Sequence, residues 1–354
     1  MQPEQIDRAL VDFGVLAGWM DGEGLPGGPF EDVVPLAGGT QNVLVRFRRG
    51  GRDYVLRRGP AHLRARTNEV LRREARVLAA LDGTDVPAPR LIAACPDERV
   101  MDGAVFYLMT PVEGFNASVA LPELHSGDAA VRYEMGLNAA RALSALGAVD
   151  HEAVGLSDFG KPEGFLERQV GRWMSELESY NALDGYPGPE IPGLDDVAAW
   201  LDANRPGTWR PGIMHGDYHL ANLMYANDGP EVAAIVDWEM CTIGDPLLDL
   251  GWLLATWPVD GDESALLAGP LGAAGGLPSA DELVATYAER ADAVAGRDLS
   301  SITWYAVLAC FKLGIVLEGT HARAFAGKAP KETGDLLHSI TLGLFRRAQA
   351  FIAG

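Results

Sequence analysis

The first third of the chain carries short runs in which apolar and polar residues follow the pattern of half-buried strands. Four such runs are present, at 43–48, 53–57, 90–94 and 105–109. Gly50 and Gly51 separate the first two runs, and a glycine pair in that position is typical of a tight hairpin. Residues 64–81 repeat apolar positions at helical spacing, and a shorter amphipathic helix is expected at 4–20. This region therefore predicts a sheet with one prominent helix.

Beyond Gly114 the pattern changes to the spacing of helices. Helical runs lie at 128–148, 163–180, 195–203, 247–256, 281–295, 301–318 and 332–352. A strand–loop–strand segment at 212–238 interrupts them, and a glycine-rich loop is expected at 260–280. The pattern predicts an α+β protein with two lobes: a small antiparallel-sheet lobe, residues 1–112, and a larger, mainly helical lobe, residues 113–354.

Composition excludes some classes of function. The chain has 49 acidic and 29 basic residues and a formal charge of −20, which argues against a protein that binds nucleic-acid phosphates. The three cysteines are far apart and fit reduced thiols. The N-terminus shows no signal-peptide pattern, and the longest apolar run, Trp304 to Leu317, is broken by Lys312 and predicts a buried helix. We expect a cytoplasmic protein without a membrane span.

The strand–loop–strand segment concentrates polar residues between apolar ones. It contains the run His215-Gly216-Asp217-Tyr218-His219-Leu220-Ala221-Asn222, and Asp237 ends an apolar run fifteen residues later. Phosphoryl transfer needs a carboxylate that orients the attacking hydroxyl and a metal that neutralises phosphate oxygens. Asp and Asn supply the hard oxygen ligands that Mg²⁺ prefers. This segment is therefore the candidate site for phosphoryl transfer.

The same residues resemble a known family, the aminoglycoside-phosphotransferase (choline-kinase-like) branch of the protein-kinase fold. Its catalytic loop reads H-G-D-x-x-x-x-N, and residues 215–222 match throughout. The resemblance implies that Asp217 is the catalytic base and that Asn222 and Asp237 bind Mg²⁺. It implies ATP or GTP as the phosphate donor. His215 is expected to hold the loop in place, and His219 is a candidate for contact with the substrate.

The small lobe offers a partial match to the nucleotide-binding residues of kinases. Protein kinases pair a strand Lys with a helix Glu at the nucleotide phosphates. Here Arg57 stands in the strand at the Lys position and Glu74 is the matching helix carboxylate, with Arg58 as a competitor for the position of Arg57. A guanidinium is bulkier than an ammonium and binds in a planar fork, so this substitution is not neutral.

Other positions follow from the same resemblance. Gly38, Gly39 and Thr40 precede the strand at residue 43 and are expected to cover the phosphates, because glycines allow close backbone approach. Backbone groups of Thr110 and Val112 are expected to meet the nucleotide base. Further along the chain, Asp245 and Asp249 could look like metal ligands. We interpret Asp245 as a helix cap, and the resemblance implies that Asp249 supports the catalytic loop.

The acceptor is the least defined part of the prediction. Residues 169–173 and 237–251 resemble the kinase-like domain of acyl-CoA dehydrogenase family members 10 and 11, which implies a small-molecule hydroxyl acceptor of the hydroxyacyl-CoA type. Arg172 and Trp173 are expected in the wall of the acceptor pocket, although roles as a surface arginine and a core aromatic fit them equally well. Phosphorylation of an aminoglycoside or macrolide antibiotic is the alternative activity. A nucleotide-binding pseudokinase or scaffold is the alternative of another class, and we expect a monomer or homodimer.

Overall fold

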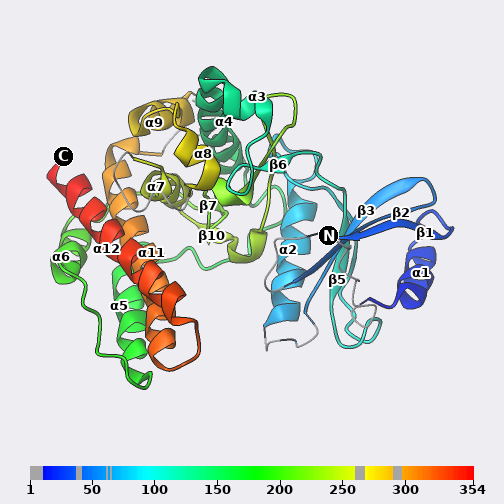
Figure 1. Ribbon diagram of the computed structural model, residues 1–354, viewed down its shortest axis with the longest axis horizontal. Helices are drawn as coiled ribbons and strands as arrows, with labels where there is room; N and C mark the ends of the chain where they lie inside the picture. The colour runs from blue at the N-terminus through cyan, green and yellow to red at the C-terminus, as the bar shows by residue number, and fades with distance from the viewer. Residues whose placement is uncertain (1–10, 37–41, 61–62, 64–65, 260–267, 290–296) are drawn as a thin grey trace. The chain divides into compact units, whose positions relative to one another are not determined.

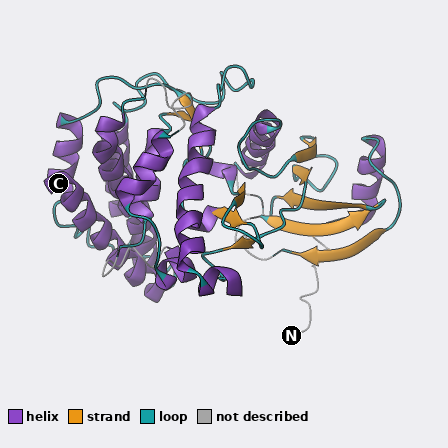
Figure 2. Cartoon of the chain, turned by 90° about the horizontal axis from the view of Figure 1, so that it is seen from above, coloured by secondary structure: helices purple, strands orange, loops and turns teal. Residues whose placement is uncertain are grey.

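The computed structural model describes residues 11–36, 42–60, 63, 66–259, 268–289 and 297–354 of the 354-residue chain. These residues form two units. The first comprises the described residues up to Glu113 together with Ala234–Glu239, and the second comprises Gly114–Ala233 and Met240–Gly354. The first unit is rich in strands and the second is mainly helical (Figure 2). The predicted lobes, 1–112 and 113–354, are each one continuous stretch of chain. In the structure, residues 234–239 belong to the first unit instead.

A five-stranded antiparallel sheet is the centre of the first unit, with strand order β1-β2-β3-β5-β4 (Figure 1). Its strands are β1 (Phe30–Pro35), β2 (Val43–Arg49), β3 (Arg52–Arg58), β4 (Leu91–Cys95) and β5 (Phe106–Met109). The predicted hairpin between β2 and β3 is confirmed. Gly50 and Gly51 have φ values of 57° and 76°, and Arg49 faces Arg52 across the turn. Two successive positive φ angles explain why this turn needs two glycines.

The two faces of this sheet carry different side chains because successive residues of a strand point in opposite directions. Phe47, Tyr54 and Leu56 are fully buried on the face that packs with helix α1 (Phe13–Gly22). Asp12 begins this helix by accepting hydrogen bonds from the N–H groups of Gly14 and Val15 at 2.8 and 3.0 Å. The opposite face carries Arg57 and is covered by helix α2.

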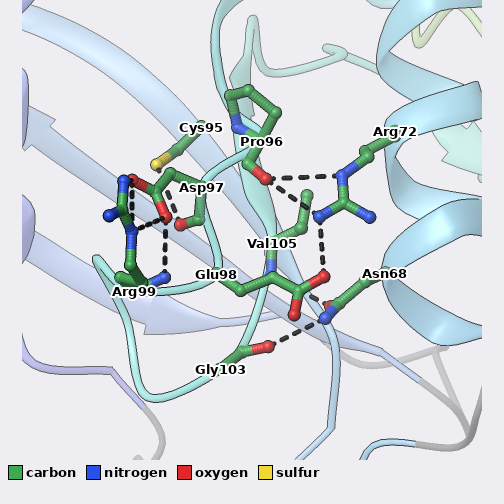
Figure 3. A network of polar contacts seen from close by, with 9 residues as sticks. All are labelled: Asn68, Arg72, Cys95, Pro96, Asp97, Glu98, Arg99, Gly103 and Val105. Atoms are coloured by element: carbon green, nitrogen blue, oxygen red, sulfur yellow. Dashed lines mark hydrogen bonds and ion pairs between the residues drawn. The ribbon is translucent and has the colours of Figure 1, made fainter.

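Helix α2 (Thr67–Leu81) is held to the sheet by polar contacts at its outer edge (Figure 3). Asn68 donates to the carbonyl of Gly103 at 2.8 Å and accepts from the N–H of Val105 at 3.0 Å. Arg72 donates to the carbonyl of Pro96 at 3.0 Å and to Glu98 at 2.6 Å. These contacts fix the rotation of the helix, so that its Leu71, Glu74, Ala75 and Leu78 side chains face inward.

The second unit consists mainly of helices. They are α3 (Glu123–Gly127), α4 (Ala129–Ala148), α5 (Gln169–Ser179), α6 (Leu194–Ala203), α7 (Leu247–Thr256), α8 (Gly269–Ala274), α9 (Ala280–Ala288), α11 (Ile302–Phe325) and α12 (Lys331–Ala353). Short 3-10 turns lie at Tyr180–Ala182, Leu220–Asn222, Trp238–Met240 and Leu299–Ser301. The short strands form a pair, β7 (Gly212–Met214) with β10 (Thr242–Gly244), and a three-stranded sheet of β6 (Phe115–Asn116), β8 (Leu223–Tyr225) and β9 (Val232–Ile235).

Helix α11 is long and apolar enough to cross a membrane by length and composition, and it is the one described helix that passes this test. Its most apolar window is nevertheless 67% buried inside the protein, which is the property of a core helix. It packs against α7 and α12, and Phe311 is among its fully buried side chains. The predicted buried helix is therefore confirmed, and it extends seven residues beyond the predicted end at residue 318.

Several expected boundaries were wrong. The helix expected at 163–180 begins only at Gln169, and residues 163–168 form turns. The glycine-rich loop expected at 260–280 contains helix α8, whose first turn holds Pro270, a position that suits proline. Strand β1 was not expected from the sequence. In the structure its burial does not alternate regularly, and its register with β2 shifts between Glu31 and Val34.

Candidate functional site

The loop after strand β7 carries the polar cluster of the second unit. Gly216 has a φ of 88°, and a Cβ atom there would lie 2.5 Å from the carbonyl oxygen of Met240. Asp249, fully buried on helix α7, accepts hydrogen bonds from the N–H groups of His215 and Gly216 at 2.6 and 2.9 Å. The role of Asp249 as a support for the loop backbone is therefore confirmed. Asp217 is the next residue in the chain, so the same hydrogen bonds fix where its side chain begins.

Asp217 is surrounded by hydrogen-bond donors. The Asn222 side-chain amide donates to its carbonyl oxygen at 2.8 Å and to Oδ2 at 3.0 Å. His219 Nε2 lies 3.3 Å from Oδ1. The 3-10 turn Leu220–Asn222 brings Asn222 back to Asp217, and Asn116 secures this turn by donating to the carbonyl of Ala221 at 2.6 Å. The structure thus brings together three residues that the sequence analysis named.

The hydrogen bonds of His219 define its neutral tautomer. The backbone N–H of Ala221 donates to Nδ1 at 3.2 Å, so Nδ1 must carry a lone pair. The proton of a neutral ring is then on Nε2, which faces Asp217. His219 therefore orients the Asp217 carboxylate through the Nε2 edge of its ring. His219 is also the residue that the sequence analysis named as a candidate for contact with the substrate.

Asp217 is held in its ionised form. Burial alone would raise the pKa of this carboxyl, but the hydrogen bond from His219, the electrostatic influence of the His219 and His215 rings, and the Asn222 amide lower it to about 2. The carboxylate is therefore available as a hydrogen-bond acceptor and as a base at neutral pH. Its low basicity fits a group that orients a hydroxyl and receives the proton late in the reaction.

Lys312 of helix α11 approaches the same loop and was not anticipated as a site residue. Its ammonium donates to the carbonyl of Gly216 at 3.3 Å and lies 4.3 Å from the ring centre of Trp252 and 5.6 Å from that of Trp173. Burial lowers the pKa of Lys312 to about 8 against the opposing effect of Asp249 and Asp217. Burial raises the pKa of Asp249 to about 7, which its two N–H donors and Lys312 partly offset. The Lys312 ammonium thus contacts the loop backbone and interacts favourably with the carboxylates of Asp217 and Asp249.

The first unit contains a second cluster, formed by β3, α2, β5 and the return segment. Arg57 donates from one nitrogen, Nη2, to Glu74 at 2.7 Å and to Asp237 at 3.2 Å. The Glu74 side chain is only 1% exposed, and its other oxygen accepts from the Tyr107 hydroxyl at 3.0 Å. The expected strand–helix ion pair is therefore present with Arg57. Arg58 is buried on the opposite face of the strand, so it is not the partner of Glu74.

Asp237 lies at the end of the segment that returns to the first unit. It has a φ of 65°, in the left-handed region, which aspartate tolerates better than most residues other than glycine. Carboxylate oxygens of Asp237, Glu74 and Glu239 lie within 4.8 Å of one another. Both oxygens of Glu74 are engaged by Arg57 and Tyr107, so Asp237 and Glu239 are the members of this group that offer the oxygen ligands Mg²⁺ prefers. Glu239 was not predicted, although it follows Asp237 by two positions in the sequence.

The other predicted residues lie as follows. Gly38, Gly39 and Thr40 fall outside the described residues. The N–H of Thr110 donates to the carbonyl of Arg90 at 2.9 Å, and Val112 is partly exposed.

The two acceptor-pocket candidates lie side by side on helix α5. Trp173 is buried next to Lys312, whereas Arg172 is exposed, with its guanidinium 5.0 Å from the centre of the Trp173 ring. Trp173 therefore has the position of a core aromatic residue. Its ring lies next to Lys312, which donates to the carbonyl of Gly216.

Comparison with known proteins gives consistent matches. Acyl-CoA dehydrogenase family member 10 of Mus musculus is 26% identical over 92% of this chain, and family member 11 of Gallus gallus is 28% identical over 87%. The matches span 29% and 39% of the lengths of those two proteins.

Solved structures share the fold. A protein of Ralstonia eutropha JMP134, assigned provisionally as an aminoglycoside phosphotransferase, is 30% identical with a TM-score of 0.77, over 96% of this chain and 98% of that one. The GDP complex of aminoglycoside 2'-phosphotransferase-IIIa is 16% identical with a TM-score of 0.58, over 93% and 97%. The fold is therefore α+β and protein-kinase-like, with two lobes. The model of the phosphotransferase enzyme family matches residues 32–283, and the chain belongs to this family.

Proposed function

We propose that the chain transfers the terminal phosphate of ATP or GTP to a hydroxyl group of a small molecule, with Mg²⁺. The observation that carries the proposal is the environment of Asp217, an ionised carboxylate oriented by Asn222 and His219 on a loop that Asp249 fixes. Such an arrangement suits the orientation of an acceptor hydroxyl. A module that only binds nucleotide would have no need of this carboxylate.

The chain's own residues would divide the reaction as follows. Asp217 accepts a hydrogen bond from the acceptor hydroxyl and receives its proton as the new P–O bond forms and the bond to the leaving nucleoside diphosphate breaks. Asn222 donates through its amide nitrogen to Asp217, which leaves its amide oxygen as a metal ligand. Asp237 supplies a second oxygen ligand, and Mg²⁺, when bound, neutralises charge on the phosphate oxygens.

Arg57 is proposed to contact the phosphates of the nucleotide. Its guanidinium has five N–H donors, so it can contact a phosphate while Glu74 holds it in place. The Gly38–Thr40 segment and the backbone of Thr110 and Val112 remain proposed contacts of the nucleotide. Nucleotide complexes of structural neighbours, one with GDP and one with ADP and hygromycin B, support a nucleotide for this fold.

For the acceptor, we propose a hydroxyacyl-CoA-type ester. Relatives named as acyl-CoA dehydrogenase family members match 86% or more of this chain, and Arg172 presents an exposed cation beside Trp173 on helix α5, which suits an anionic acceptor. An antibiotic acceptor remains the competing proposal, because the aminoglycoside and macrolide phosphotransferases share the fold.

The test is a screen of acceptors by product mass. The protein is incubated with Mg²⁺ and either ATP or GTP, together with hydroxyacyl-CoA esters, aminoglycosides or macrolides, and Asp217→Ala is the control. We expect a hydroxyacyl-CoA ester to gain one phosphoryl group with the native chain only. Phosphorylation of an aminoglycoside alone would contradict the acyl-CoA proposal. Binding of nucleotide without consumption, with every acceptor, would favour the pseudokinase, and no binding of either nucleotide would refute the kinase proposal.

A further inference from the structure

A second group of metal-ligating side chains lies between the two long C-terminal helices, and the phosphoryl-transfer proposal does not use it. Glu318 and His321 stand one turn apart on α11, and His338 projects from α12. One carboxylate oxygen and one nitrogen from each ring all lie within 4.8 Å of one another. Two histidines and a glutamate are a common ligand set for zinc.

The Glu318 carboxylate lies in the protein core. Its side chain is fully buried, and a buried carboxylate is costly unless it is paired. Among the described residues its one ion-pair partner is His338, whose Nδ1 lies 2.7 Å from Oε2. The Tyr186 hydroxyl donates to the other oxygen at 2.7 Å. A divalent cation would supply positive charge directly to this buried carboxylate.

The rings of the two histidines lie against each other. His321 and His338 stack with their ring centres 4.4 Å apart and their planes inclined by 19°. A neutral imidazole presents a lone pair, and this is the form that binds a metal. A divalent cation would therefore satisfy both the rings and Glu318.

The distances require only a small adjustment. Ligand atoms of a tetrahedral zinc site are separated by roughly 3.3 Å, given metal–ligand distances of about 2.0–2.1 Å. Side-chain rotations that open the contact between Glu318 and His338 and bring the third ligand closer would meet this. The Tyr186 hydroxyl already orients the carboxylate through its hydrogen bond.

We propose that Glu318, His321 and His338 bind zinc and so link helices α11 and α12, with a water molecule as the fourth ligand. Nitrogen ligands favour Zn²⁺ over Mg²⁺, which distinguishes this site from the all-oxygen set around Asp237. The site is independent of the proposed phosphoryl transfer.

The experiment measures zinc bound to the full chain. Protein stripped with a chelator is dialysed against Zn²⁺ in the presence of excess Mg²⁺, and the bound zinc is counted by mass spectrometry. We expect close to one zinc per chain. Co²⁺ should give the visible absorption of a tetrahedral site, and zinc should raise the unfolding temperature.

His321→Ala is the decisive variant because it leaves the hydrogen bond between Glu318 and His338 intact and should fold. We expect at least a tenfold loss of zinc affinity, with no rise in unfolding temperature on adding zinc. His338→Gln, which keeps a hydrogen-bond donor, should behave in the same way, and His151→Ala, outside the group, should bind as the native chain does. Failure of the native chain to retain zinc, or unchanged binding by His321→Ala, would overturn the proposal.

Discussion

Replacing Arg57 with alanine should destabilise the protein strongly, because it leaves the Glu74 carboxylate buried. Arg57 and Glu74 are 11% and 1% exposed, and their charged atoms are 2.7 Å apart. Removing one partner of such a buried pair costs about 3–5 kcal/mol, whereas replacing both with apolar residues is often neutral. The Tyr107 hydroxyl is the remaining donor to Glu74 and compensates only in part.

The loss should depend on pH. Burial raises the pKa of Glu74 even beside Arg57, and without the guanidinium the pKa rises further. A carboxyl whose folded-state pKa lies above its unfolded value destabilises the folded state at high pH. This cost diminishes as the pH falls and the group takes up a proton. The Arg57→Ala variant should therefore recover part of its stability between neutral pH and pH 5.

Urea unfolding followed by circular dichroism measures the effect. Arg46→Ala is the matched control, because Arg46 forms an exposed ion pair with Glu113, in the segment after β5, and its loss should cost less than about 1 kcal/mol. The double variant Arg57→Met with Glu74→Leu should recover most of the loss. The reasoning is refuted if Arg57→Ala is no more destabilising than Arg46→Ala, or if the double variant loses as much as the sum of the single ones.

Three further predictions concern the loop of the second unit. Asp249→Asn places an amide N–H against one of the two backbone N–H donors, so one hydrogen bond is lost. The free energy of unfolding in urea should fall by about 2–4 kcal/mol, and turnover should fall as well. An unchanged unfolding midpoint would contradict this. Gly216→Ala should lower the free energy of unfolding by more than about 2 kcal/mol, because Gly216 has a positive φ and lies close to the Met240 carbonyl. Gly171→Ala, which has open space on helix α5, should raise it by up to about 1 kcal/mol. Equal unfolding midpoints for the two variants would refute the strain argument. Lys312→Met should remove any fall in turnover near pH 8, since the native ammonium loses its proton there; persistence of that fall would assign it to another group.

Local patterns predicted much of the architecture. The Gly50-Gly51 hairpin depends on neighbouring residues, and the apolar spacing of α2 is a property of one segment, so both could be read from the sequence. The orientation of Glu74 followed from the same spacing, because flanking apolar residues turn it inward. Strand β1 could not be recognised, since its pairing with β2 includes a shift in register.

The roles of charged residues that meet from distant parts of the chain were harder to predict. Lys312 looked like an interruption of an apolar helix, and only the packing of α11 shows that its ammonium reaches the carbonyl of Gly216. The sharing of Arg57 between Glu74 and Asp237 depends on the return of residues 234–239 to the first unit. Nothing in the local sequence indicates either contact.

The central claim is that Asp217 promotes phosphoryl transfer while other residues bind the nucleotide. The most direct measurement is single-turnover transfer from Mg²⁺-nucleotide to the acceptor by Asp217→Asn, alongside the affinity for that nucleotide. We predict a rate about 10²–10⁴-fold below that of the native chain, with nucleotide affinity unchanged. The pKa of Asp217, lowered to about 2, also predicts that this carboxyl causes no loss of native activity from neutral pH down to about pH 4. Transfer by Asp217→Asn at a rate close to the native one would contradict the account.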